Sequence, residues 1–231
     1  MNKDSILKEV TMMPFISKLN SRLLSLSTNE RRLSAEAYMR NQFPFIGVDT
    51  TTRRKVFKAI LEEAGKPLFE DLDKTINYLF TLERELQYCA VELFALYKKE
   101  WDSDSIAIIE KCIVTKSWWD TVDYIASDLA GPYFKLFPKQ IIPVTERWNK
   151  SGNFWLQRSS LLFQKKYREQ TNKDLLAKYI LHCAHSNEFF IQKAIGWCLR
   201  EFAKTDPAWV KKFVQQNALK PLSVREALKH F

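Results

Sequence analysis

Glycine is scarce in this sequence, and its scarcity excludes several classes of protein. The chain of 231 residues contains 5 glycines, whereas average usage would give roughly 16. No Gly-x-Gly-x-x-Gly or Walker pattern can be assembled from them, so a dinucleotide-binding or P-loop enzyme is excluded in its usual form. A turn-rich β fold is also disfavoured, because its tight turns depend on glycine.

Histidines are few, and the cysteines are not paired. The spacing of His182 and His185 fits no common metal site, and with 3 histidines in the chain Ser-His-Asp or Cys-His catalysis is disfavoured. No Cys-x-x-Cys motif occurs, and all four cysteines lie in apolar helical segments. We therefore predict reduced core thiols at Cys89, Cys112, Cys183 and Cys198.

Membrane and export segments are missing as well. The first 15 residues carry Lys3, Lys8 and Glu9 and lack the apolar run of a signal peptide. Nowhere do about 18 apolar residues follow one another. We expect a cytoplasmic protein with no membrane partner.

What the sequence does contain is a large apolar fraction and an excess of positive charge. Hydrophobic residues make up 46%, which supports one folded domain over residues 1–231. Lys and Arg number 36 against 27 Asp and Glu, a formal net charge of +9. This excess favours a polyanionic partner, of which nucleic acid is the simplest.

Apolar residues recur at helical spacing along almost the whole chain, so we predict an all-α protein. The first helix with a clear start signal is expected to end near Phe43, and the next near Glu63. The start signals are Ser27 with Glu30, Thr50 to Thr52, Asp206 with Pro207, and Ser223 with Glu226.

A pair formed by an apolar residue and glutamine recurs at a regular interval. Gln157 and Gln192 are 35 residues apart, and Gln87 lies 70 residues before Gln157. A further copy is expected near Val122. This period is close to that of stacked helix pairs, so we predict an α-solenoid superhelix with a concave face.

The repeat register predicts which side chains share a face. Asp123, Arg158 and Lys193 occupy equivalent positions, aligned with Tyr88 of the first copy. They should line one strip of the concave face. A charged groove with basic members suits a phosphate backbone.

Two helices combine a buried stripe with an unusual outer face. From Ser117 onward, the expected core residues are Trp118, Val122, Ile125, Ala126 and Leu129. Trp119 lies off this stripe, and Asp123 follows it by four residues, within contact range. The alternative is that Trp119 packs against the next repeat and Asp123 pairs with a basic side chain.

In the second of these helices, near Phe190, the expected core residues are Ile191, Ala194, Ile195, Cys198 and Phe202. Its other face carries Lys193, Trp197, Arg200 and Lys204 at helical spacing. Basic and aromatic side chains in alternation are typical of nucleic-acid binding. A solvated basic face whose tryptophan covers a neighbouring helix is the alternative.

Four segments together resemble the AlkD-like DNA alkylation repair glycosylases. The similarity runs from about Ala35 to the C-terminus, and its most specific part is the Trp-Trp-Asp-x-Val-Asp string. The segments are 37–47, 115–123, 155–158 and 189–201.

This resemblance implies a HEAT-like α-solenoid that holds duplex DNA and excises N3- and N7-alkylated purines such as 3-methyladenine and 7-methylguanine. It implies no metal or nucleotide cofactor. Asp123 would be the catalytic carboxylate, and Trp119 and Trp197 would flank the deoxyribose of the lesion. Among the DNA contacts, the resemblance implies Arg158 and Tyr38. We also expect DNA contacts from Lys193 and Arg200, on the basic and aromatic face, and from Lys116. We expect a monomer that is associated with the nucleoid when bound to DNA.

The chemistry is consistent with these residue types. An N3- or N7-alkylpurine is already cationic and leaves without a general acid, so the reaction mainly needs a carboxylate to stabilise positive charge on the sugar. The same carboxylate can position water. Two other classes stay open: a non-catalytic DNA-binding protein of the same fold that senses distorted duplexes, and a protein-interaction scaffold.

Overall fold

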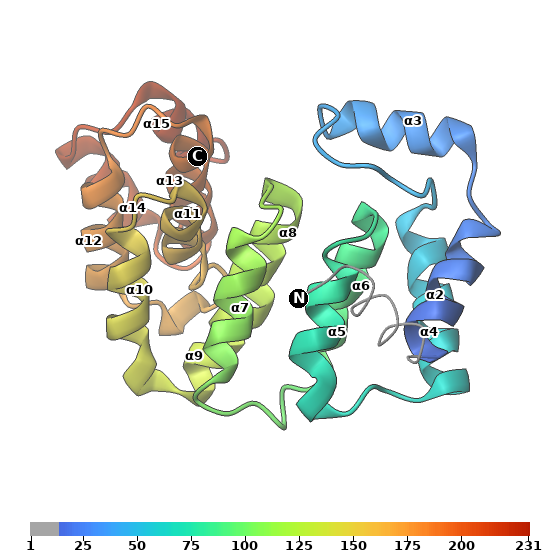
Figure 1. Cartoon of the computed structure of the whole chain (residues 1–231). Helices are drawn as coiled ribbons and strands as arrows, with labels where there is room; N and C mark the ends of the chain where they lie inside the picture. Colours follow the sequence, from blue (N-terminus) through green and yellow to red (C-terminus); the bar gives the residue numbers. More distant parts are fainter. Residues whose placement is uncertain (1–13) are drawn as a thin grey trace. The chain divides into compact units, whose positions relative to one another are not determined.

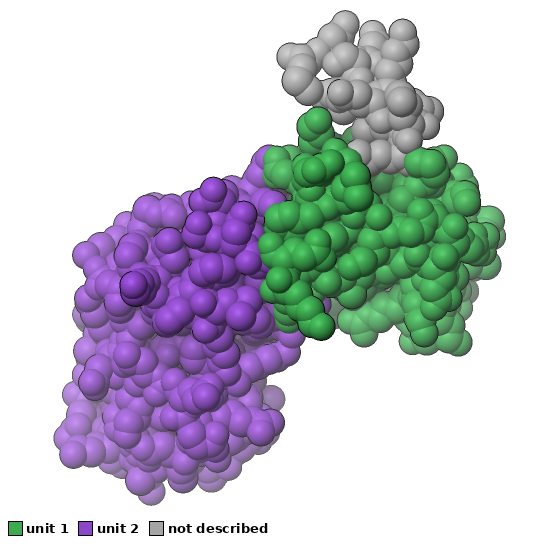
Figure 2. Space-filling model, turned by 90° about the horizontal axis from the view of Figure 1, so that it is seen from below, with its two compact units in different colours: residues 1–100 green, residues 101–231 purple. Residues whose placement is uncertain are grey.

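The computed structural model describes residues 14–231, which are helical or irregular and contain no strand. The prediction of an all-α protein is confirmed. Contacts divide the chain into two compact units, residues 1–100 and residues 101–231 (Figure 2). Within the described residues, no helix is long and apolar enough to cross a membrane.

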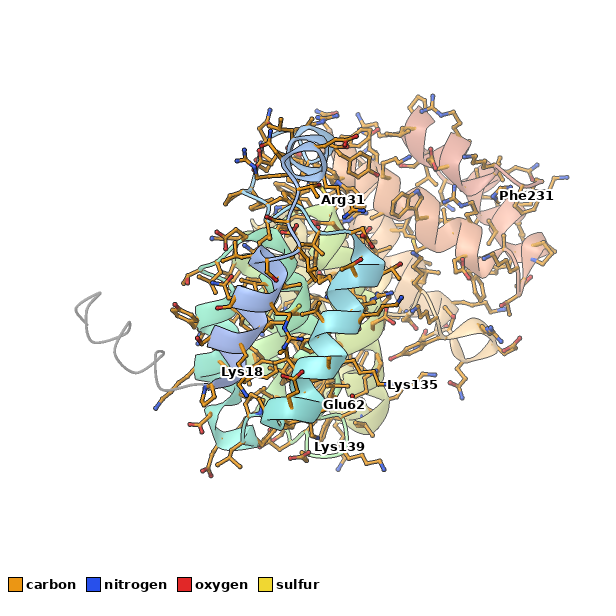
Figure 3. The ribbon with its side chains drawn as sticks, turned by 90° about the vertical axis from the view of Figure 1, so that its right-hand side faces the viewer. Lys18, Arg31, Glu62, Lys135, Lys139 and Phe231 are labelled. Atoms are coloured by element: carbon orange, nitrogen blue, oxygen red, sulfur yellow. The ribbon has the colours of Figure 1, made fainter. Side chains whose placement is uncertain are left out.

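The first unit is built from paired helices. Helix α2, which carries Lys18, runs beside α4, which carries Glu62 (Figures 1 and 3), and α5 packs against α6. Leu19, Ile60 and Leu86 are fully buried between them. The elements are α2 (Pro14–Leu24), α3 (Asn29–Tyr38), α4 (Thr50–Ala64), η1 (Phe69–Asp71), α5 (Leu72–Leu79) and α6 (Arg84–Ala95).

Helix α3 starts close to its predicted position but is shorter than expected. Its N-cap is Thr28, whose hydroxyl accepts the backbone N–H of Arg31 at 3.3 Å. The helix ends at Tyr38 rather than near Phe43, because the next turn contains left-handed residues, Arg40 (φ 55°) and Asn41 (φ 54°). Left-handed backbone cannot continue a right-handed helix.

The cap of α4 is Asp49 and not one of the three threonines. Its carboxylate accepts the backbone N–H of Thr52 at 2.9 Å and also the hydroxyl of that residue. The loop before Asp49 is fixed by Glu85 of α6, whose carboxylate accepts the backbone N–H groups of Ile46, Gly47 and Val48. One buried carboxylate thus accepts hydrogen bonds from three backbone N–H groups that are not paired within a helix or strand.

The second unit contains the longer series of helices (Figure 1). Helix α10 packs on α11, α11 on α13, and α13 on α15. Val122, Leu129, Trp148 and Ile195 are among its fully buried core residues. The elements are α7 (Ser105–Val114), α8 (Trp119–Tyr124), the π-helix η2 (Ile125–Ala130), α9 (Gly131–Leu136), η3 (Pro138–Gln140), α10 (Ile141–Asn149), α11 (Phe154–Leu162), η4 (Arg168–Gln170), α12 (Lys173–Cys183), α13 (Phe189–Phe202), α14 (Pro207–Gln216) and α15 (Pro221–Ala227).

The last two helices show one correct and one wrong start signal. Asp206 caps α14, accepting the backbone N–H of Trp209 at 3.0 Å, with Pro207 at the first helical position as predicted. Helix α15 starts at Pro221, so Ser223 and Glu226 are not a capping pair. Both side chains instead bind groups of α13.

The repeated glutamines have one structural role in common. The side-chain amide of each donates to a backbone carbonyl five to eight residues earlier: Gln87 to Leu82, Gln157 to Asn149, and Gln192 to Ser186. Each glutamine therefore ties the start of its helix either to the preceding connection or, for Gln157, to the end of the preceding helix, α10. The equivalence supports the 35-residue register, whereas the closure of all pairs into one superhelix stays a prediction.

Candidate functional site

Helix α8 begins two residues later than predicted, at Trp119, and its winding changes after Tyr124. Trp118 is extended (φ −156°, ψ 161°) and precedes the helix, so it is not part of the helical stripe. Its ring instead packs against Trp155 and Phe190, with centroids 5.9 and 5.1 Å away. The remaining predicted stripe is fully buried: Val122, Ile125, Ala126 and Leu129.

The segment that follows, η2, is a π-helix. Within it the Ser127 hydroxyl donates to the backbone carbonyl of Asp123 at 2.9 Å. π-Helical turns are rare and are found frequently at functional sites. Asp123 thus lies where regular winding ends.

Asp123 and Arg158 form the central ion pair of the site. Arg158 Nε lies 2.6 Å from Asp123 Oδ1, and Arg158 Nη2 lies 2.8 Å from Oδ2. The Arg158 side chain is 1% exposed and the Asp123 side chain is 16% exposed. The residues are 35 positions apart, so equivalent positions of adjacent repeats are in direct contact.

Arg158 is therefore buried rather than displayed on the surface. Its remaining terminal nitrogen, Nη1, donates to the backbone carbonyl of Phe190. Its guanidinium carbon lies 5.2 Å from the centre of the Trp197 ring. Arg158 thus joins the Asp123 carboxylate to Trp197. With its side chain only 1% exposed, it is not placed to contact a DNA backbone as expected from the sequence.

The half-buried outer face of α13 is organised by a residue that the sequence did not suggest for this site. Glu226 of α15 accepts hydrogen bonds from Lys193 Nζ (2.8 Å), Trp197 Nε1 (3.2 Å) and Arg200 Nη1 (3.0 Å). These three donors are the i, i+4 and i+7 members of the predicted basic and aromatic row. The fourth member, Lys204, pairs instead with Glu201 at 2.7 Å.

The ionisation of Glu226 follows from these partners. Hydrogen bonding to Lys193, and then to Trp197 and Arg200, holds the pKa of Glu226 below its usual value. The carboxylate is therefore ionised at neutral pH. It offsets part of the positive charge that Lys193 and Arg200 place around the indole.

The remaining candidate residues are more scattered. Trp119 is half-buried at the start of α8, and Lys116 is exposed, in a left-handed conformation (φ 44°). Tyr38 lies in the first unit, 70% exposed, beside a cavity of about 560 Å³ between α3, α4 and α6. Within the second unit, Asp123, Arg158, Trp197, Lys193 and Arg200 are linked by direct contacts.

The cysteines are buried and free, as predicted. Burial raises the pKa of the Cys89 and Cys183 thiols to about 11 and that of Cys198 to about 12. Such thiols stay protonated and are poor nucleophiles and metal ligands at neutral pH. Among residues 14–231, no group of three or more His, Cys, Asp or Glu side chains could hold a metal ion.

Comparison with known proteins agrees with the resemblance seen in the sequence. A family model described as DNA alkylation repair enzyme matches residues 19–231. A predicted DNA alkylation repair enzyme from Enterococcus faecalis has a similar solved structure, with 32% identity and a TM-score of 0.83 over 89% of this chain and 96% of that chain. None of the curated proteins matches significantly. The chain belongs to the DNA alkylation repair enzyme family.

Proposed function

We propose that the protein is a DNA glycosylase that hydrolyses the N-glycosidic bond of cationic N3- and N7-alkylated purines in duplex DNA. The observation that carries the proposal is the carboxylate of Asp123, oriented by Arg158 and partly exposed to solvent. Trp197 lies on the same guanidinium. Asp123 is the proposed catalytic residue, with Trp119 and Trp197 at the sugar.

The reaction requires stabilisation of positive charge more than proton transfer. An alkylated purine that already carries a charge leaves as a neutral base, so the deoxyribose becomes cationic as the bond breaks. A fixed carboxylate directed at that sugar lowers the barrier because its orientation costs nothing at the moment of reaction. The pair with Arg158 supplies this orientation.

The ion pair leaves Asp123 with capacity for substrate. A carboxylate has about four lone-pair sites, and the two hydrogen bonds from Arg158 occupy one on each oxygen. The free sites can bind an attacking water or face the sugar. Each indole face, from Trp119 and Trp197, can add about 0.5–2 kcal/mol of cation–π stabilisation.

Duplex DNA fits the charge of the surface around this site. Lys193 and Arg200 lie half-buried on the outer face of α13, and Lys165 Nζ lies 5.5 Å from the Trp197 ring centre. Lysine and arginine side chains of this kind contact phosphates without reading sequence. In this proposal the DNA contacts are Lys193, Arg200, Lys116 and Tyr38, whereas the buried Arg158 acts by orienting Asp123.

The test is release of free 7-methylguanine from a methylated duplex, measured by chromatography. We expect Asp123→Asn to fold and bind DNA but to release the base at least ~100-fold more slowly, about 2.7 kcal/mol of lost transition-state stabilisation. The matched control is Asp128→Asn, since Asp128 lies five residues later and pairs with an exposed lysine, Lys166. The control should release base at the normal rate.

Two results would overturn the assignment. Full activity of Asp123→Asn would remove that residue from catalysis. Tight, salt-sensitive binding of the methylated duplex by the unmodified protein, without any base release, would identify a non-catalytic DNA-binding protein.

A further inference from the structure

One carboxylate from α15 is shared by three side chains of the proposed DNA-facing surface. Glu226 Oε1 accepts from Lys193, while Oε2 accepts from both Trp197 and Arg200. The Glu226 side chain is 11% exposed. A carboxylate so completely surrounded by donors is held in one orientation, and it holds its donors in turn.

The backbone of α13 is shaped to let this carboxylate approach. Gly196 directly precedes Trp197, and a Cβ atom at Gly196 would lie 2.3 Å from the Cβ of Glu226. Only a glycine allows α15 to pack this closely. The Ser223 hydroxyl, which donates to the Gln192 carbonyl at 3.0 Å, fastens the same two helices one turn away.

The main consequence concerns the orientation of the Trp197 ring. Cations lie within 6.0 Å of the ring centre, at Arg158, Lys165, Lys193 and Arg200. These contacts attract the ring faces but do not fix its rotation. The hydrogen bond from Trp197 Nε1 to Glu226 is directional and does fix it.

We propose that Glu226 is a positioning residue that holds the Trp197 indole in the orientation that base excision requires. This inference rests on the proposed glycosylase function. Glu226 does so at a cost in DNA affinity, because it retains Lys193 and Arg200 against the protein and cancels one positive charge. Loss of Glu226 therefore slows the chemical step without weakening DNA binding, whereas loss of mere structural support would impair both.

The first experiment compares Glu226→Ala and Glu226→Gln under single-turnover conditions with a 7-methylguanine duplex. We expect Glu226→Ala to release base at least ~10-fold more slowly, with an unchanged or tighter dissociation constant for undamaged duplex. Glu226→Gln should stay within ~3-fold of the normal rate, because its amide oxygen still accepts the indole N–H and Lys193 can turn towards solvent. Rescue by glutamine separates hydrogen bonding from charge.

The matched control is Glu146→Ala. Glu146 also pairs with two lysines, Lys150 and Lys178, and neither ion pair includes a tryptophan. The Glu146→Ala substitution removes one negative charge from the same unit without changing a partner of Trp197. The variant should therefore release base at the normal rate. In a Trp197→Phe background, Glu226→Ala should add little further loss, because the group that it positions has no N–H.

The second experiment needs no enzymatic activity. In a ¹H–¹⁵N spectrum the Trp197 indole N–H is assigned by its loss in Trp197→Phe. We expect this signal to shift and exchange faster with solvent in Glu226→Ala, and to change little in Glu226→Gln. If the unmodified protein releases no base, the glycosylase proposal fails, and the spectrum still reports whether Glu226 holds the ring.

Three outcomes would overturn the positioning role. The first is a normal release rate in Glu226→Ala. The second is equal slowing in the alanine and glutamine variants, which would point to charge alone. The third is an indole signal that does not respond to Glu226→Ala.

Discussion

Arg158 orients the Asp123 carboxylate by a planar, two-point contact that a lysine cannot reproduce. We expect Arg158→Lys to release 7-methylguanine at least ~10-fold more slowly in single turnover, because the carboxylate gains rotational freedom while its neighbour stays cationic. Arg147→Lys is the control, since Arg147 forms a similarly bidentate but more exposed ion pair with Glu110. This control should release base at the normal rate. A normal rate in Arg158→Lys would show that orientation of Asp123 is not needed.

The buried thiols should respond to pH in a defined direction. Burial raises the pKa of Cys198 from an ordinary value of 9.0 to about 12. Because the folded state holds this proton more tightly, the stabilisation is fully present below about pH 9 and is lost as the pH rises towards 12. We expect iodoacetamide to leave the native thiols unmodified at pH 8 and to label them in denaturant, as measured by mass spectrometry. Labelling of the native protein would contradict the predicted burial.

For single residues, the sequence predicts which residues belong to the site better than it predicts which side chains they contact. The repeat register placed Asp123 and Arg158 at equivalent positions but as separate members of a surface strip. The alternative that Asp123 pairs with a basic side chain is the one observed. Arg158 was not named as that partner, because arginine is rarely buried and a register does not give the distance between repeats. Glu226 was assigned to a helix cap, since nothing in its own segment indicates that Trp197 lies opposite.

Among the helices, the close contact of α13 with α15 depends on a single glycine. Replacing Gly196 by alanine would place a methyl group against Glu226 and the backbone of Ser223. We expect Gly196→Ala to lower the free energy of unfolding by about 1–3 kcal/mol, the usual cost of overpacking. The change in the free energy of unfolding is measured by denaturant titration. Gly152→Ala is the control, because nothing lies within 4 Å of its added Cβ, and equal stabilities of the two variants would contradict the packing argument.

The helices themselves were largely predictable, whereas their ends and their winding were not. The buried stripes of α8 and α13 were predicted from apolar spacing and are confirmed apart from Trp118. The π-helical turn after Asp123 was not expected, because Ile125, Ala126 and Leu129 fit an ordinary helical stripe as well. Helix ends such as Tyr38 depend on left-handed residues that are not glycine, which sequence signals rarely reveal.

For the molecule as a whole, the net charge of +9 predicts that DNA binding depends strongly on salt. Each phosphate contact contributes a slope of about −0.9 to log K against log salt. Two contacts already weaken binding roughly 12-fold between 50 and 200 mM salt. Anisotropy titrations with undamaged duplex should show at least this change, with a shallower slope for Lys193→Gln than for Lys178→Gln. Affinity that is independent of salt would argue against phosphate binding.

The pairing of Asp123 with its counterpart one repeat later also limits how such a site can arise or be transferred. A single repeat carries either the acid or the base at this position, so the pair needs two repeats side by side. Inserting a repeat between them, or grafting α8 alone into another helical scaffold, would separate the carboxylate from its guanidinium. The smallest transplantable module that keeps this ion pair is therefore a pair of neighbouring repeats.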